Sequence, residues 1–176
     1  MYTHCLLPQT VNFGLLKNGS IVVGYLEESF VNSGSFEHLV TGIVWLVRNG
    51  RNFVDQAKRI EDASSQTTSS LRGFIEVVSA RSAIGHDAEG RIIIVNVDGK
   101  TGTRRGVNLY QMADLLISLG VVNAINLDGG GSVNVVENGT LVNYPSDPCP
   151  GNRYRYSCER EVSTITWCAE LIPTTT

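Results

Sequence analysis

The chain has 176 residues, enough for one domain with its own hydrophobic core. Its 14 Lys and Arg against 17 Asp and Glu give a formal net charge of −3, which excludes a general attraction to nucleic acid or to an anionic membrane surface. No apolar run approaches the roughly 20 residues that span a bilayer, and Met1–Gln9 lacks the charged start and long apolar middle of a signal peptide. We therefore expect no membrane segment, and any binding of anions to be local.

Apolar runs separated by Asn-Gly or Glu-Gly pairs predict a strand-rich domain built from β-hairpins. In the first hairpin, Phe13–Leu16 and Ile21–Leu26 flank Asn18-Gly19. The same pattern returns three times, at Gly42–Val47 with Asn49-Gly50, at Ala83-Ile84 and Ile92–Val97 around Glu89-Gly90, and at Val133–Val136 before Asn138-Gly139.

The segment between Gln56 and Arg72 has no apolar periodicity. Its middle part, Asp62–Ser70, consists of Asp, Ala, Ser, Gln and Thr. Such a composition predicts a mobile surface loop.

One amphipathic helix is predicted between Asn108 and Gly120. Its apolar residues recur at three- and four-residue spacings, at Leu109, Met112, Ala113, Leu116 and Leu119. Asn108 supplies an N-cap with Gln111 three residues later, and Gly120 ends the helix. The next segment, Val121–Leu127, is nearly all apolar, as in a strand buried on both faces. We predict an α+β fold, a mixed, hairpin-rich β-sheet with this central strand and the helix packed on it.

The residues Asp128–Ser132, an acid, three glycines and a serine, follow the predicted central strand directly. Glycine lets the backbone take positive φ angles and approach a ligand closely, and a tight turn rarely needs three glycines. A carboxylate, a hydroxyl and several backbone N–H groups at one spot favour a site for an anion or a sugar. The alternative is a glycine-rich loop that serves packing alone.

Two other catalytic interpretations of this loop are weak. No GxGxxG is present and the following segment predicts a strand, which argues against dinucleotide binding. Ser132 lacks the G-x-S-x-G elbow of serine hydrolases, and the sequence cannot bring His86 and Asp128 together as triad partners. A histidine without a catalytic role is the simpler interpretation of His86.

Two arginines are candidates for binding an anion. Arg81 lies between the apolar segments Phe74–Val78 and Ala83-Ile84, where a guanidinium needs a partner or a ligand. Arg160 opens the strand-like segment Arg160–Thr164. A structural salt bridge for Arg81 and a sheet-edge charge for Arg160 are the alternatives.

None of the four cysteines belongs to a CxxC pair, which argues against a zinc or redox site. Cys149 and Cys158 flank a loop rich in Pro, Gly, Asn and Tyr, which predicts a disulfide of roughly 2–3 kcal/mol in the loop-entropy model. Cys5 and Cys168 are then left to pair across the domain.

Two Asn-X-Ser/Thr sequences begin at Asn18 and Asn138, and they predict N-glycosylation. Together with the disulfides they favour an oxidising compartment, the lumen of the secretory pathway. The last residues, 171–176, are expected to be a frayed tail.

Several segments together resemble the phosphodiester glycosidase family. In chain order they are Ser79–Asp87, Gly106–Leu109, Val121–Ser132, Asn138–Leu141 and Tyr144–Asp147. The resemblance extends from about Phe13 to Cys168, and the order of the motifs argues against a chance match.

The resemblance implies a hydrolase that removes a covering N-acetylglucosamine (GlcNAc) from GlcNAc-phospho-mannose diesters on lysosomal enzymes and exposes mannose 6-phosphate in the Golgi. Family catalytic domains carry a further N-terminal portion, so we expect residues 1–170 to be such a domain lacking that portion. The expected partners are these glycans, with no nucleic acid, and a homo-oligomer is left open.

In this chemistry the departing phosphate monoester is already a good leaving group, so the handling of charge matters more than a strong general acid. We predict Asp128 and Arg81 as catalytic residues. Asp128 would stabilise an oxocarbenium-like sugar or activate water, and Arg81 would meet the phosphate. The predicted substrate-binding residues are Gly129, Gly130, Gly131, Ser132, Arg160 and His86. No cofactor is assigned; the alternative role of Asp128 is to hold calcium, which a carboxylate and loop carbonyls suit.

Two functions from other classes remain. One is a noncatalytic sugar-phosphate-binding module, and binding without hydrolysis would select it. The other is a secreted structural domain in which the glycines serve packing, and a folded sample with neither binding nor hydrolysis would select that.

Overall fold

The computed structural model describes residues 10–61 and 70–166, apart from the side chains of 152–156. Its largest element is a five-stranded antiparallel sheet with the order β5-β4-β8-β6-β7. These strands are β4 (Trp45–Arg48), β5 (Arg51–Asn52), β6 (Arg81–Asp87), β7 (Ile92–Val97) and β8 (Val121–Asn126). The predicted central strand is therefore the central strand, and the α+β class is confirmed, with every pairing antiparallel.

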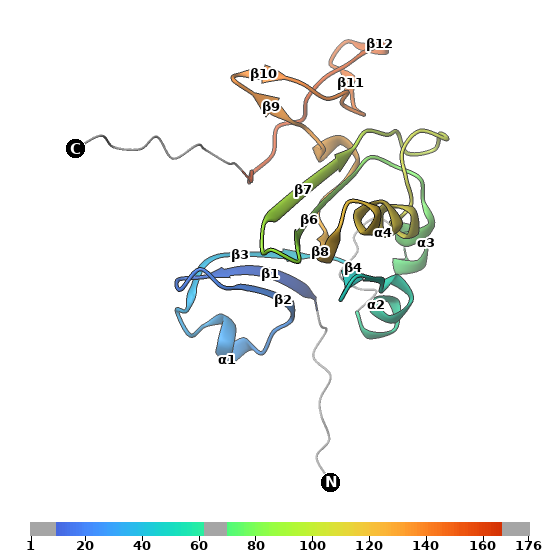
Figure 1. Cartoon of the computed structure of the whole chain (residues 1–176). Helices are drawn as coiled ribbons and strands as arrows, with labels where there is room; N and C mark the ends of the chain where they lie inside the picture. Colours follow the sequence, from blue (N-terminus) through green and yellow to red (C-terminus); the bar gives the residue numbers. More distant parts are fainter. Residues whose placement is uncertain (1–9, 62–69, 167–176) are drawn as a thin grey trace, which may run out of the picture.

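A second antiparallel sheet lies beside the first and has the order β2-β1-β3 (Figure 1). Its strands are β1 (Val11–Leu16), β2 (Ile21–Tyr25) and β3 (Phe36–Gly42), and a short helix, α1 (Glu28–Val31), connects the last two. Val11 and Phe13 of β1 are buried and join the core under β8.

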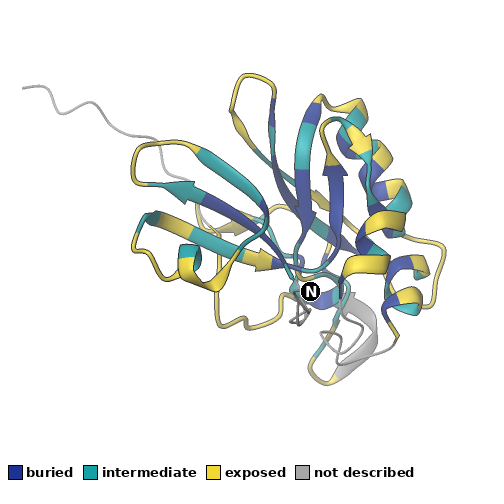
Figure 2. Ribbon diagram, turned by 90° about the horizontal axis from the view of Figure 1, so that it is seen from below, coloured by how far each residue is buried: buried dark blue, intermediate teal, exposed yellow. Residues whose placement is uncertain are grey.

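Helix α4 (Leu109–Ser118) covers the five-stranded sheet together with α2 (Val54–Ile60) and α3 (Leu71–Glu76). The predicted capping box is present: Asn108 Oδ1 accepts from Gln111 N at 2.9 Å, and Gln111 Oε1 accepts from Asn108 N at 3.0 Å. The predicted apolar stripe is buried, except that Leu119 is 53% exposed. In Figure 2 the buried residues gather in the strands and on the sheet-facing sides of the helices. No helix of the described residues is long and apolar enough to cross a membrane.

A buried acid, Glu61, joins the two sheets just after α2. Its carboxylate accepts hydrogen bonds from Val44 N at 2.6 Å, Trp45 N at 2.9 Å and the Tyr25 hydroxyl at 3.0 Å. Burial raises the pKa of Glu61, although the two backbone N–H groups and the hydroxyl oppose this rise. The strands therefore meet around a charge that the backbone itself solvates.

The predicted hairpins at β1–β2, β4–β5 and β6–β7 are confirmed. At the last predicted hairpin the turn is present, but the strands β9 (Val136–Glu137) and β10 (Thr140–Leu141) are short, and Val133–Val135 is not a strand. A 3-10 turn, η2 (Gly130–Ser132), precedes them. Helices α2 and α3 flank the segment predicted as a loop, Asp62–Ser70, and residues 62–69 of that segment lie outside the described residues.

A second ribbon, β11 (Pro148–Cys149) with β12 (Asn152–Ser157), follows β10 and lies at the same end of the molecule, beyond the end of β7 (Figure 1). The predicted disulfide between Cys149 and Cys158 closes this ribbon, with Cα atoms 4.8 Å apart. Cys5 and Cys168 lie outside the described residues, so their pairing stays a prediction.

Candidate active site at the glycine-rich loop

The loop Asp128–Ser132 leaves the central strand β8 and is tied back to the start of β6. Leu127 N donates to Ser82 O at 2.8 Å, and Gly130 N donates to Ala80 O at 2.9 Å. These bonds join residues about fifty positions apart in the sequence. The loop is therefore held at the end of the inner strands β8 and β6, while Asp128 is exposed to solvent.

The three glycines of the loop are required for different reasons. A Cβ on Gly129 would lie 2.8 Å from Ala80 O, too close for a backbone atom to yield easily. Gly130 has a φ of +57°, the left-handed region in which side chains are strained. A Cβ on Gly131 would collide with the Asp147 carboxylate and the Arg160 guanidinium.

The backbone amides of the loop are mostly engaged by the protein itself. Gly129 N donates to the Asp128 carboxylate at 2.8 Å, Gly130 N to Ala80 O, and Ser132 N to Gly129 O at 3.1 Å. Of the three glycine amides, only that of Gly131 has no partner within the described part of the chain. We expected the amides of all three glycines to be free for a bound anion, and only the Gly131 amide is left without a partner among the described residues.

Asp128 keeps one carboxylate oxygen open. Its Oδ1 accepts the bond from Gly129 N, and no described residue bonds to Oδ2. The residue is exposed, so this oxygen can meet a ligand or a water molecule. Among the described residues, no group of three or more His, Cys, Asp or Glu side chains could hold a metal ion, and calcium at Asp128 and the loop carbonyls stays a prediction.

Arg160 lies over the loop and is held by an acid that the sequence did not single out as a site residue. Its Nε and Nη2 both contact Asp147 Oδ2 at 2.7 Å, and its Nη1 donates to Ser132 Oγ at 3.4 Å. The side chains of Arg160 and Asp147 are 48% and 34% exposed, so a ligand can reach the pair. Only the motif Tyr144–Asp147 hinted at this acid.

Arg81 lies beneath the loop, with its charge turned inward. Its Cδ is 3.7 Å from where a Cβ of Gly129 would be, which places its stem against the loop. Its Nη2 donates to Phe74 O at 2.7 Å and Val77 O at 2.8 Å, and its Nε donates to Val107 O at 3.4 Å. The residue is 2% exposed, and burial lowers its pKa to about 10. The predicted convergence with the loop is present in the stem, but the guanidinium has no open face.

His86 is not brought to the loop. Along the β6–β8 pairing, Ala83 lies opposite Asn126 next to the loop, whereas His86 lies opposite Asn123. These three steps along the strand amount to about 10 Å at the usual rise per residue. Of the predicted site residues, His86 alone therefore belongs to the other end of β6.

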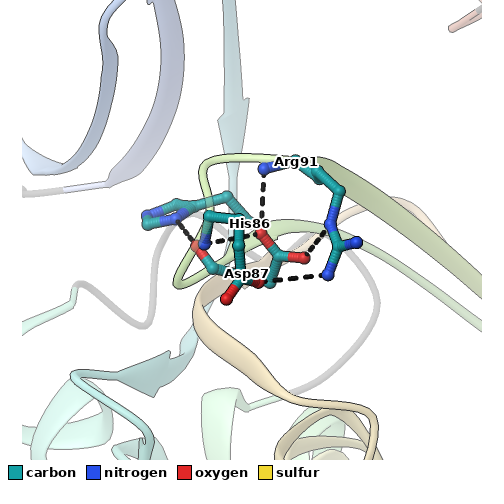
Figure 3. Close-up of polar contacts among 4 residues, drawn as sticks. His86, Asp87 and Arg91 are labelled. Carbon is teal, nitrogen blue, oxygen red and sulfur yellow. Dashed lines mark hydrogen bonds and ion pairs between the residues drawn. The ribbon is translucent and has the colours of Figure 1, made fainter.

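The polar contacts of His86 form a separate network (Figure 3). Its Nε2 faces Asn123 Nδ2 at 3.1 Å, and its Nδ1 lies 2.8 Å from Asp87 O. Burial acts to raise the pKa of Asp87, but hydrogen bonds from Arg91 and its charge outweigh burial and lower this pKa. The network fixes the β6–β7 turn, which is a structural role.

The comparisons with known proteins agree with the resemblance that the motifs indicated. Residues 7–166 match the family model described as phosphodiester glycosidase. The bovine and human proteins named N-acetylglucosamine-1-phosphodiester alpha-N-acetylglucosaminidase are each 46% identical to this chain over 159 residues, which is 89% of its length. That stretch is 30% of each mammalian protein.

A solved structure of a zebrafish protein of the same name, its catalytic domain auto-inhibited by pro-peptide, matches with a TM-score of 0.79 at 43% identity. The match covers 88% of this chain and 50% of the zebrafish chain. The chain thus spans half of that chain and less than a third of the mammalian relatives.

Proposed function

Because the chain belongs to the phosphodiester glycosidase family, we propose that it supplies the glycine-loop part of a domain that hydrolyses sugar-1-phosphate diesters. The proposed substrate is a GlcNAc-1-phospho-mannose diester on a glycan of a lysosomal enzyme, and the products are GlcNAc and mannose 6-phosphate. Two features support this: the names of relatives 46% identical to the chain, and an exposed acid, Asp128, in the loop whose Ser132 contacts the exposed Arg160.

In the proposed reaction the C1–O bond of GlcNAc breaks, water supplies the new oxygen on C1, and the phosphate monoester leaves. Asp128, with its open Oδ2, stabilises the oxocarbenium-like sugar or takes a proton from the attacking water. Arg160 Nη1, Ser132 and the Gly131 amide bind the phosphate. The contact between Arg160 and Ser132 is the observation on which the proposal depends, because it places an exposed cation at the loop.

We propose an indirect role for Arg81, predicted as a catalytic residue. Its guanidinium binds the carbonyls of Phe74, Val77 and Val107, and its stem lies against Gly129. Arg81 and Ala80 thus form the surface beneath the loop, which we call its floor, and the three bonds hold that surface in place. A buried cation below the loop also favours negative charge above it.

The proposed compartment is the lumen of the secretory pathway, with the Golgi as the site of action. The disulfide between Cys149 and Cys158 suits an oxidising lumen. Asn18 and Asn138 are exposed in hairpin turns, where an oligosaccharide can be attached. Peptide mapping of secreted material, with and without a glycosidase that removes N-glycans, tests both sites.

The main experiment measures release of GlcNAc from a GlcNAc-1-phospho-mannose diester in water enriched in ¹⁸O. The assay uses the 176-residue chain, alone and joined to the N-terminal portion of a family catalytic domain. Label in GlcNAc, with loss of about a hundredfold or more in turnover for Asp128→Asn, is the expected result. Label in the phosphate would instead assign P–O cleavage. Near-normal turnover by Asp128→Asn would overturn the role of that carboxylate, and binding without turnover by wild type would select a noncatalytic sugar-phosphate-binding module.

A further inference from the structure

The disulfide-closed ribbon presents two opposite charges side by side. Asp147 stands two residues before Cys149, and Arg160 stands two residues after Cys158. Cys158 N also donates to Asp147 O at 2.9 Å, so the two chain segments stay paired just outside the disulfide. The bridge therefore sets the spacing of the segments that carry Asp147 and Arg160.

Asp147 holds Arg160 in one orientation. Two of the guanidinium nitrogens, Nε and Nη2, contact the same carboxylate oxygen at 2.7 Å, which leaves Nη1 directed to Ser132 Oγ. An exposed arginine otherwise samples many rotamers, and ordering them on binding costs conformational entropy. Holding the side chain in advance removes that cost.

Gly131 makes room for this arrangement. A side chain there would collide with both members of the ion pair, so the pair lies directly on the glycine backbone. The hydroxyl of Ser132 is then next to Arg160 Nη1. These two donors share one small surface, which suits the oxygens of a phosphate.

We propose that Asp147 and the Cys149–Cys158 disulfide are positioning elements that hold Arg160 ready to bind a phosphate oxygen beside Ser132. The identity of the ligand rests on the proposed function, but the positioning is argued from the contacts of this ribbon. Asp147 acts through Arg160 and does not itself contact the phosphate.

The sign of one mutational effect separates positioning from simple charge. If Asp147 were only a nearby negative charge, Asp147→Asn would strengthen the binding of an anion by removing repulsion. If Asp147 positions Arg160, the same change weakens binding because the guanidinium is released. Asp147→Glu keeps the carboxylate and should recover part of the affinity.

The experiment is titration calorimetry of the 176-residue chain with inorganic phosphate and with α-GlcNAc-1-phosphate. Arg160→Gln should weaken binding about tenfold or more, and Asp147→Asn several-fold, on the order of one lost charge-assisted hydrogen bond. The matched control is Arg72→Gln, which breaks an exposed ion pair with Glu76 on helix α3, makes no contact with Arg160 or Ser132, and should leave affinity unchanged. Thermal melting checks that each variant is folded.

The disulfide is tested with the paired change Cys149→Ser and Cys158→Ser, because a reductant would also reach Cys5 and Cys168. Affinity should fall as in Asp147→Asn, and adding Asp147→Asn to the serine variant should cause little further loss. Equal or tighter binding by Asp147→Asn overturns the proposal, as does a wild type that binds neither probe. Phosphate binding with this pattern but without hydrolysis in either form of the assay upholds the positioning and overturns the proposed function alone.

Discussion

The floor and the outer surface of the glycine loop each carry an arginine, and the two are used in opposite ways. On the floor, Arg81 is buried, and its Nε and Nη2 donate to three backbone carbonyls. On the outside, Arg160 is half-exposed and keeps Nη1 for a hydroxyl at the surface. An arginine whose donors are bonded to the backbone therefore serves stability, whereas an arginine with a donor at the surface is available to bind a ligand.

Where the two sheets meet, a buried acid is satisfied by neighbouring donors, just as the buried Arg81 is satisfied by neighbouring acceptors. Glu61 is buried and accepts from Val44 N, Trp45 N and the Tyr25 hydroxyl. Asp128, in contrast, is exposed and has one oxygen open. If the distinction is correct, changes to the inner charges alter folding and changes to the outer charges alter function.

The largest expected effect separates the two arginines. Arg81→Met should lower the free energy of unfolding by about 3 kcal/mol, because three half-buried carbonyls lose the donor that a buried guanidinium supplies. Arg160→Met should change it by less than about 1 kcal/mol, as for an exposed ion pair. Urea unfolding followed by circular dichroism measures both. Similar losses for the two variants would break the comparison.

The next effect concerns the contact between the loop and its floor. Gly129→Ala should cost about 2 kcal/mol, since the new methyl group meets the Ala80 carbonyl and the backbone must shift. Gly14→Ala is a useful contrast, because there the methyl group meets the movable ring of Phe36. Thermal unfolding should therefore show the larger loss for Gly129→Ala, and the reverse order would contradict the rigid floor.

The smallest expected effect is a change in how the free energy of unfolding depends on pH, through Glu61 between the two sheets. The raised pKa of Glu61 means that the folded state binds a proton more tightly, so this group's contribution to stability falls as pH rises from the unfolded pKa, about 4.5, through the raised folded value. Glu61→Gln removes that fall and costs about 1 kcal/mol because Val44 N loses its acceptor. The difference from wild type should shrink between pH 4 and pH 7 in urea titrations. A difference that widens with pH would show the opposite shift.

Local signals in the sequence were enough to predict the frame of the site. The cap at Asn108 and the apolar stripe of α4 act within a few residues, and the apolar run of β8 requires burial wherever it packs. The loop after β8 could be recognised because its glycines, acid and serine are consecutive. The disulfide was predictable because both cysteines flank one short turn.

The use of each polar group could not be predicted in this way, because it depends on distant partners. Gly130 N is taken by Ala80 O, and the Arg81 guanidinium is taken by carbonyls from two other segments. The partner of Arg160 is Asp147, which reaches it only because the ribbon folds back. Helices α2 and α3 were missed since each is too short, at 7 and 6 residues, to show a helical period over more than two turns.

The position of β8 in the sheet has a consequence for how the chain folds. Its two neighbours, β4 and β6, both precede it in the sequence, so neither can complete its pairing until β8 has been synthesised. Strands that must find distant partners pair slowly and leave open edges while they wait. The glycine loop follows β8 directly and is anchored to β6, so the loop takes its shape only after the sheet has closed. A nascent chain therefore acquires its proposed phosphate-binding surface only after the open edges of β4 and β6 have been paired with β8.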